Sequence, residues 1–239
     1  MLSRDRAERA THPVEPLVLL PGMNCSAALW SRLEVGPALT PVLTEPSLDD
    51  QVECLLNQLP PRFALAGLSL GGIVAMAIAR QAPQRVTRLC LMSTNPHEPT
   101  QAQRSGWTAQ RAELTAGASA RELQESILSL LLSPAVLNER PDLVQLTLQM
   151  ADEIGAATLD AQLRMQATRI DERPSLTQLR CPTLIIAARD DALCSVDRHV
   201  EMAACVPGAQ LVILERCAHL SPLEHPAQVS EHLARWRSW

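Results

Sequence analysis

The sequence predicts an α/β fold, with a mostly parallel sheet of about six strands and helices on both faces. Short, continuous apolar runs recur along the chain, and longer segments with helical spacing of apolar residues separate them. Continuous apolar runs are typical of strands that are buried on both faces, as in parallel sheets. A third observation is a long stretch, from about 96 to 175, that contains helical patterns and no strand pattern.

The apolar runs give the predicted strands in order. The long runs are Leu17–Leu20, Phe63–Leu68, Arg88–Met92, Thr183–Ala188 and Gln210–Leu214. A sixth and shorter candidate is Pro41–Thr44. The first run stops at Pro21-Gly22, a dipeptide that marks a turn.

Helical patterns fill the intervals between the strands and close the chain. They span Ser26–Leu39, Ser47 to about Leu59, Leu70–Gln81, Ser195–Cys205 and Leu223–Trp236. Ser47, followed three residues later by Asp50, resembles a capping box, and Pro60-Pro61 ends that helix. Alternation of strands and helices predicts right-handed crossovers between parallel strands.

The segment from about 96 to 175 is predicted to be a helical insertion between the third and fourth long strands. Helical spacing is found in Leu123–Leu132, Asp142–Met150 and Ala156–Thr168, and Ser133-Pro134 is typical of a helix start. We expect about four helices. The insertion depends on its neighbours for a core, so residues 1–239 are expected to form one domain.

The composition excludes several function classes. The chain has 239 residues, is 46% hydrophobic and carries a net charge of −5, as expected for a globular protein. It contains no Lys, which excludes Schiff-base catalysis, pyridoxal-phosphate attachment and a Walker-type phosphate loop. It contains no Tyr, which excludes a phenol as acid or base. Its Arg residues do not gather on one face, so nucleic-acid binding is not expected.

The chain is expected to be cytoplasmic and to have no membrane contact. The N-terminus has no apolar segment of the kind that a secretory signal contains. No run approaches the ~18 apolar residues of a membrane span. The seven cysteines are odd in number and form no C-x-x-C pair, which favours reduced thiols.

The strongest chemical signal is the sequence GLSLGG at 67–72, between a predicted strand and a predicted helix. This is the G-x-S-x-G pattern, in which Ser69 stands on a tight, strained turn with its Oγ exposed above the sheet. The flanking glycines let strand and helix approach without Cβ clashes. Ser69 is therefore the candidate nucleophile.

A serine nucleophile needs a base, and the base needs an orienting carboxylate. In this arrangement the chain order is serine, acid, histidine. Asp190 and Asp191 follow the strand Thr183–Ala188, and spacing alone does not choose between them. His219 follows the strand Gln210–Leu214, whereas His199 lies within a predicted helix. Strand carboxyl ends are where open parallel sheets bind ligands.

The reaction also needs two N–H donors for the developing oxyanion. One is expected to be the amide of Leu70, the residue after the nucleophile. The other is expected to be the amide of Met23, because Gly22 permits a tight turn after the first strand.

With these residues in place, the sequence resembles the α/β-hydrolase superfamily over nearly its whole length, and most of all the small, cofactor-free carboxylesterases. The resemblance implies an α/β-hydrolase fold in which the insertion is a helical cap that sets substrate choice. It implies no metal and no cofactor. CPTLIIAARDDALCS resembles the acid loop and implies Asp191, CAHLSPLEHP implies His219, and LLPGMNCSAALW implies Met23. Many relatives carry His-Gly where this chain has Pro21-Gly22.

The predicted activity is that of a serine hydrolase that cleaves carboxylic esters or thioesters of small molecules through an acyl-enzyme on Ser69. Trp107, Met150 and Met165 in the insertion are candidate substrate-binding residues, and they favour an apolar substrate. The Leu128–Leu132 run is a further candidate, although it suits the core of the insertion better.

Two alternatives remain at this point. The same triad supports lactone hydrolysis, C–C bond hydrolysis or lyase chemistry. Such substrates usually carry carboxylates and require an Arg in the pocket, for which the candidates are Arg104, Arg111, Arg164 and Arg169. The other alternative is a binding protein with the hydrolase fold and no catalysis, and the full Ser–Asp–His set disfavours it.

Overall fold

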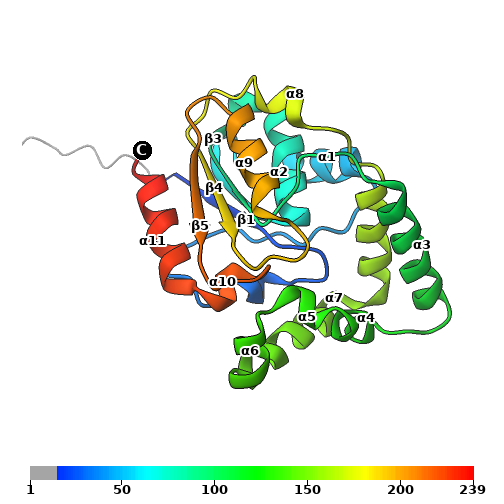
Figure 1. The fold of residues 1–239 in the computed structure, drawn as a ribbon. Helices are drawn as coiled ribbons and strands as arrows, with labels where there is room; N and C mark the ends of the chain where they lie inside the picture. Colours follow the sequence, from blue (N-terminus) through cyan, green and yellow to red (C-terminus); the bar gives the residue numbers. More distant parts are fainter. Residues whose placement is uncertain (1–14) are drawn as a thin grey trace, which may run out of the picture.

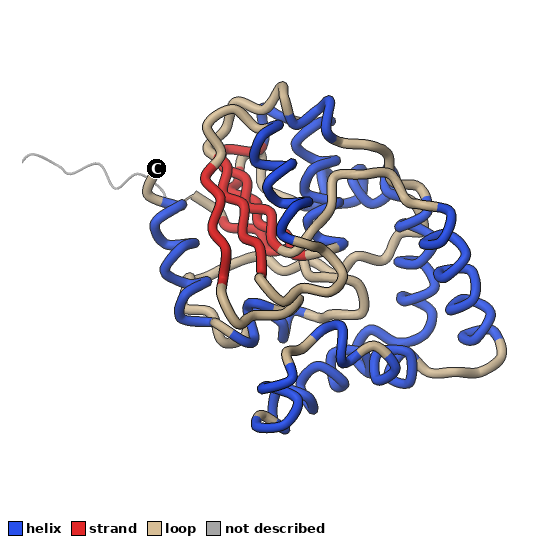
Figure 2. The backbone as a smooth tube through the Cα atoms, in the orientation of Figure 1, coloured by secondary structure: helices blue, strands red, loops and turns tan. Residues whose placement is uncertain are grey.

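The centre of the molecule is a parallel five-stranded sheet, seen in the computed structural model, which describes residues 15–239 (Figures 1 and 2). The strands are β1 (Leu17–Leu20), β2 (Phe63–Leu68), β3 (Val86–Met92), β4 (Thr183–Ala188) and β5 (Gln210–Leu214). They pair in chain order, and every pair is parallel. The predicted α/β class is confirmed, and the strand bounds agree with the apolar runs to within two residues.

The described residues contain five strands, compared with about six expected. Pro41–Thr44, the candidate sixth strand, is irregular. Instead, Leu39 forms an isolated parallel bridge with Val18 on the free edge of β1. The Leu39 amide donates to the Leu17 carbonyl (2.8 Å), and the Leu19 amide donates to the Leu39 carbonyl (2.9 Å). Pro41 has no N–H to continue this ladder, so pairing stops after one residue.

Helices cover both faces of the sheet (Figure 1). On one face, α1 (Leu48–Gln58), α2 (Leu70–Gln81) and α9 (Val196–Cys205) bury their apolar sides against alternate strand residues such as Val18 and Leu65. On the other face, α11 (Pro226–Arg237) and the short helix η1 (Ala27–Trp30) pack on the intervening residues, such as Leu19 and Ala66. Side chains alternate between faces along a strand, so strands that are apolar throughout bury both faces.

Most helix predictions agree with the structure. The bounds of α2 agree at both ends, and Ser47 caps α1 by accepting the Asp50 amide at 3.2 Å. The predicted helix Ser26–Leu39 is wrong, because only the one turn of η1 forms. Gly36 adopts φ +73°, and the chain then turns towards the edge of β1. The last predicted helix is divided into α10 (Ser221–Glu224) and α11 by Pro226.

Between β3 and β4 the chain forms helices only. They are α3 (Gln101–Thr115), α4 (Ala120–Ser126), α5 (Leu128–Leu131), α6 (Pro134–Glu139), α7 (Pro141–Ala167) and α8 (Arg173–Leu176). The number exceeds the expected four because short helices replace the run Leu123–Leu132. The two helices predicted on either side of Gly155 are two arms of α7, which bends at this residue (φ +74°, ψ 165°). Helix η2 (Pro83–Arg85) precedes β3.

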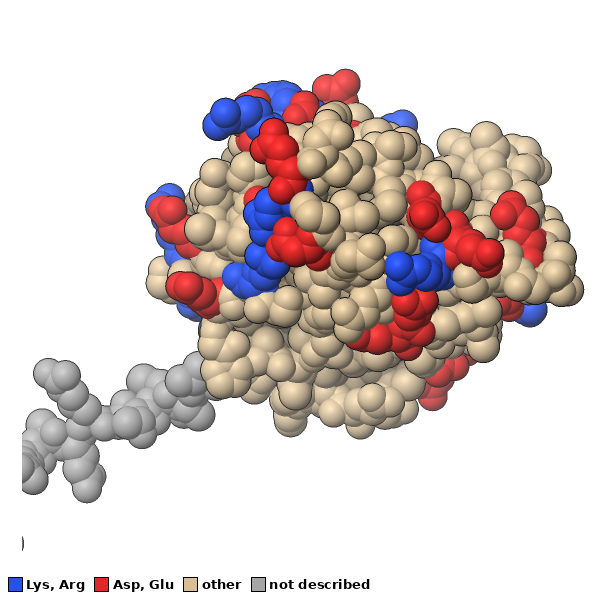
Figure 3. Space-filling view, turned by 90° about the horizontal axis from the view of Figure 1, so that it is seen from below, with Lys and Arg blue, Asp and Glu red and all other residues tan. Residues whose placement is uncertain are grey.

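Charged groups of both signs mingle on the face seen from below (Figure 3). Arg121 pairs with Asp152, and both Arg140 and Arg32 pair with Asp142. Among residues 15–239, no helix combines the length and apolar character that crossing a membrane requires. Residues 1–14, which make up most of the N-terminal segment compared above with a secretory signal, lie outside the described residues.

Candidate active site

Ser69 occupies a strained turn between β2 and α2. Its backbone has φ 54° and ψ −116°, a conformation that residues other than glycine rarely adopt. A Cβ on Gly67 would lie 2.2 Å from the Gly71 carbonyl oxygen, and one on Gly71 would lie 2.1 Å from the Leu20 oxygen. The two glycines of the motif are therefore needed for the close approach of strand and helix. Ser69 is only partly buried, at the carboxyl end of β2.

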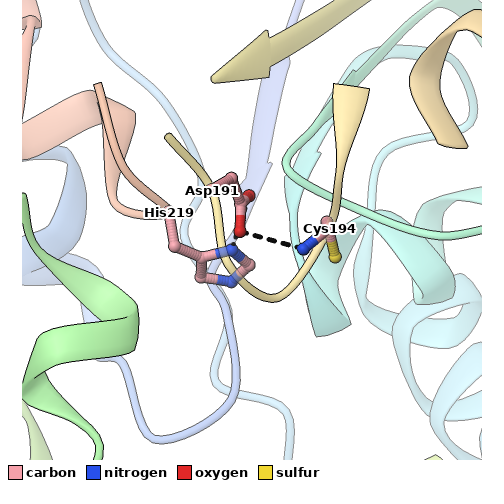
Figure 4. Close-up of side chains that lie close together, drawn as sticks. All are labelled: Asp191, Cys194 and His219. Atoms are coloured by element: carbon pink, nitrogen blue, oxygen red, sulfur yellow. Dashed lines mark hydrogen bonds and ion pairs between the residues drawn. The ribbon is translucent and has the colours of Figure 1, made fainter. Parts of the chain in front are cut away.

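Asp191 and His219 come together from the loops after β4 and β5. The Nδ1 of His219 lies 2.8 Å from Oδ2 of Asp191, and both side chains are buried (Figure 4). The other carboxylate oxygen of Asp191 accepts the amides of Leu193 (2.8 Å) and Cys194 (2.9 Å). Asp190, which spacing could not distinguish from Asp191, is exposed.

The environment of Asp191 favours its charged form. Burial would raise the pKa of this carboxyl, but the charge and hydrogen bond of His219, together with the two loop amides, lower the pKa below its ordinary value. A carboxylate at Nδ1 fixes the neutral ring with its proton on Nδ1, which leaves Nε2 as an acceptor.

Ser69 and His219 line one cavity. Within residues 15–239, no hydrogen bond joins the Ser69 hydroxyl to the imidazole. Catalytic hydrogen bonds are often long in unliganded enzymes and tighten when substrate binds. The structure therefore brings all three candidate triad residues to one site, with the acid–histidine contact formed.

The two predicted oxyanion donors lie next to Ser69. Leu70 is the first residue of α2, and Met23 lines the cavity. The loop that carries Met23 touches the nucleophile turn, because a Cβ on Gly22 would lie 3.5 Å from Cβ of Ser69. Within the described part of the chain, neither amide donates to a protein acceptor.

Asn24, which sequence reasoning did not select, joins this loop to the insertion. Its backbone amide donates to Oε1 of Gln162 in α7 (2.8 Å). Its side-chain amide donates to the Ala120 carbonyl and to Oε1 of Gln124 in α4, both at 2.9 Å. These bonds are buried and hold the left-handed Asn24 (φ 59°) in place, so the preceding amide of Met23 has a fixed direction.

Thr94 and His199, which the sequence analysis did not select as supporting residues, hold the backbone of the nucleophile turn. The Thr94 hydroxyl donates to the Ser69 carbonyl (2.8 Å), and the Thr94 amide donates to Nε2 of His199 (3.1 Å). His199 is fully buried and its Nδ1 donates to the Ser195 carbonyl (2.9 Å). Burial lowers the pKa of His199, which keeps the ring neutral and able to accept.

The cavity has a volume of about 150 Å³ and an open mouth, and its walls are mainly apolar. The insertion supplies one side through α3, α4 and α7, and the loops after the strands supply the other. Trp107, a candidate substrate-binding residue, lines the cavity. Met150 and Met165 do not line it, which corrects the expectation for both, because each is fully buried in the packing of α7 against the sheet layers. Leu131 is the member of the Leu128–Leu132 run that reaches the cavity.

Of the four candidate arginines, Arg169 alone lines this cavity. Arg111 and Arg164 both pair with Asp160, at 2.8 and 2.7 Å. Arg104 donates to the Ala167 carbonyl. Arg169 is 6% exposed and lies over the Trp107 ring, 5.3 Å from its centre.

The ligand atoms of Asp191, Cys194 and His219 lie within 4.8 Å of one another, which raises the question of a metal site. Both carboxylate oxygens and Nδ1 are already used in hydrogen bonds. Burial raises the pKa of the Cys194 thiol, so it stays protonated at neutral pH, whereas a metal ligand must be a thiolate. The donor set suits an acid–histidine pair better than a metal.

The chain is similar to several known proteins. The family model described as the alpha/beta hydrolase family matches residues 9–232. A pimeloyl-[acyl-carrier protein] methyl ester esterase from Nitrosomonas europaea is 31% identical over 76% of this chain and 74% of its own length. A protein of the same name from Aromatoleum aromaticum is 29% identical over 88% and 93%. A thermophilic esterase from Thermogutta terrifontis has a similar structure (TM-score 0.82, 21% identity, 93% of this chain and 89% of that one).

Proposed function

Since the chain belongs to the alpha/beta hydrolase family and is an ester-cleaving hydrolase, we propose that Ser69 is its nucleophile, with His219 as base and Asp191 as the acid that orients it. The observation that carries the proposal is the buried Asp191–His219 pair, whose histidine lines the same cavity as a serine on a strained turn. The class of substrate is a carboxylic ester or thioester of a small molecule.

In the first half of the reaction, Nε2 of His219 takes the proton of the Ser69 hydroxyl while Oγ attacks the ester carbonyl. The carbonyl oxygen becomes an oxyanion, which accepts from the amides of Met23 and Leu70. Asp191 stabilises the imidazolium that forms. The imidazolium then protonates the departing alcohol, and the acyl group remains on Ser69.

In the second half, His219 takes a proton from water as the water attacks the acyl carbonyl. The same two amides hold the second oxyanion, and collapse releases the carboxylic acid and restores the Ser69 hydroxyl. Each turnover therefore consumes one ester and one water and yields one acid and one alcohol. No external redox partner is needed.

We further propose that helices α3–α7 act as a cap over Ser69 and that residues 1–239 form one domain. The cap supplies apolar walls such as Leu123 and Leu159, which suit an aliphatic acyl chain.

The proposed compartment is the cytoplasm. All seven cysteines are free thiols, and three of them, Cys54, Cys181 and Cys205, are partly accessible. Free thiols persist in reducing surroundings.

Labelling with a fluorophosphonate probe and turnover of p-nitrophenyl butyrate test the assignment together. The folded wild-type chain should be labelled and active, and Ser69→Ala should lose both properties. Ser105→Ala is the matched control, because Ser105 is an exposed serine on α3, and it should behave as wild type. Labelling of Ser69→Ala at the wild-type rate would place the nucleophile elsewhere.

A further inference from the structure

Arg169 is a buried cation without a buried anion. Its residue is 6% exposed, and it forms no ion pair with any residue between 15 and 239. Burial lowers the pKa of its guanidinium to about 10, which still leaves the group charged at neutral pH. A buried charge is costly unless an opposite charge or a full set of hydrogen bonds compensates it.

The hydrogen bonds of Arg169 leave part of the guanidinium free. Nη1 donates to Oε1 of Gln166 and Nη2 donates to Oε1 of Gln103, each at 3.0 Å. Both acceptors are neutral amides. The buried Nε has no acceptor among the described residues. Because a guanidinium has five N–H donors, three of them, Nε–H included, have no acceptor among the described residues.

Arg169 lies in the wall of the reaction site. Arg169, Gln103 and Gln166 line the same cavity as Ser69 and His219. Cys194, whose amide donates to Asp191, also lines this cavity. Trp107 covers the guanidinium on one side, which fixes its plane.

We propose that Arg169, oriented by Gln103 and Gln166, binds a free carboxylate on the substrate, so that the natural substrates are half-esters of dicarboxylic acids. A carboxylate is planar and accepts two parallel N–H bonds from one guanidinium edge. The ester end then lies at Ser69 and the acid end at Arg169, with the apolar cavity wall around the chain between them. This inference rests on the proposed esterase function and adds the class of acyl group to it.

The test compares two methyl esters that differ only in charge, monomethyl adipate and methyl hexanoate, with alcohol release as the readout. The wild-type chain should have the higher kcat/KM for monomethyl adipate. In Arg169→Gln the ratio of the two kcat/KM values should fall by about 30-fold, mainly through KM for the charged ester, as expected for loss of a charge-assisted hydrogen bond. Monomethyl esters from succinic to suberic acid would show which chain length spans the site.

Two further variants keep the result interpretable. Arg169→Lys keeps the charge without the planar edge, so it should retain part of the preference for the charged ester. It serves as the test variant if Arg169→Gln folds poorly. Arg104→Gln removes a nearby positive charge that does not line the cavity, and its ratio should stay within about 3-fold of wild type, since a screened charge contributes little. Adipate should inhibit the wild-type chain competitively and Arg169→Gln far less.

The outcomes separate this inference from the function on which it rests. If the wild-type chain hydrolyses both esters without preferring the charged one, the carboxylate site is refuted and the esterase assignment stands. If Arg169→Gln and Arg104→Gln lower the ratio equally, general electrostatics replaces a specific site. If no ester is hydrolysed and the fluorophosphonate does not label Ser69, the proposed function itself fails.

Discussion

Replacing Asp191 by Asn, with Asp190→Asn as control, tests the proposed triad most directly. The two residues are adjacent and chemically identical, and each change removes one negative charge. Asp191 is buried and lies 2.8 Å from His219, whereas Asp190 is exposed. A difference between the two variants therefore reports the contact with His219 and not the loss of charge in this loop.

The hydrogen bonds of Asp191 give the reason for a large expected effect. In Asp191→Asn, the side-chain oxygen would go on accepting the amides of Leu193 and Cys194, which leaves the NH₂ group towards His219. That NH₂ is a donor, so Nδ1 of the ring must accept and the ring proton moves to Nε2. A protonated Nε2 cannot take the proton of Ser69. The expected loss in kcat is about 10⁴-fold, or about 5.5 kcal/mol of transition-state stabilisation.

The assay is steady-state hydrolysis of p-nitrophenyl butyrate, with circular dichroism to show that both variants fold. Asp190→Asn should keep kcat within about 3-fold of wild type, because an exposed charge contributes little. The reasoning is refuted if Asp190→Asn loses more activity than Asp191→Asn, or if Asp191→Asn keeps more than about a tenth of wild-type kcat.

Three further outcomes follow from the packing. Gly71→Ala should lower the free energy of unfolding by about 3 kcal/mol or more in urea titrations, because its Cβ would meet a backbone oxygen at 2.1 Å. The control Gly106→Ala lies in open space on α3 and should raise the free energy of unfolding by about 0.5–1 kcal/mol. His199→Ala should lower kcat by about 10-fold with little change in KM, because Thr94 loses its acceptor, and His199→Gln should recover part of the loss. Because the pKa of Asp191 is lowered in the folded state, the ionised carboxylate stabilises the fold above about pH 3.9, and this stabilisation is lost as pH falls through the folded pKa. The difference in the free energy of unfolding between wild type and Asp191→Asn should therefore become smaller in acid.

The strands and the triad loops were predictable because local pattern determines them. A strand buried on both faces must be apolar throughout, which makes Phe63–Leu68 and Thr183–Ala188 readable without any neighbour. Parallel strands end at one edge of a sheet, so residues that follow β2, β4 and β5 had to gather there. The choice of Asp191 over Asp190 needed either the resemblance to a family or the contact with His219, because the two residues are adjacent in one loop.

The residues that hold the site together were not predictable, because their partners are distant in sequence. Asn24 bonds Gln162 and Gln124, and His199 bonds Thr94, over separations of 100 to 138 residues. The same limit explains why Met150 and Met165 were expected at the cavity but do not line it. Helical spacing shows that a residue lies on the apolar side of a helix, but this side of α7 meets the sheet layers at some positions and the cavity at others.

The arginines show most clearly what cannot be predicted from sequence, because an Arg has the same local sequence pattern whether or not a carboxylate pairs with it. Arg111, Arg164 and Arg169 all lie in or beside helical segments of the insertion, and no local pattern separates them. In the structure Asp160 pairs with Arg111 and Arg164, whereas Arg169 is buried with amide oxygens as its acceptors. A cation that the protein leaves uncompensated beside its reaction site has a physical reason to bind an anion. Substrate preference in this chain therefore depends on which charges the fold has already paired, a property that belongs to the tertiary structure and not to any segment of sequence.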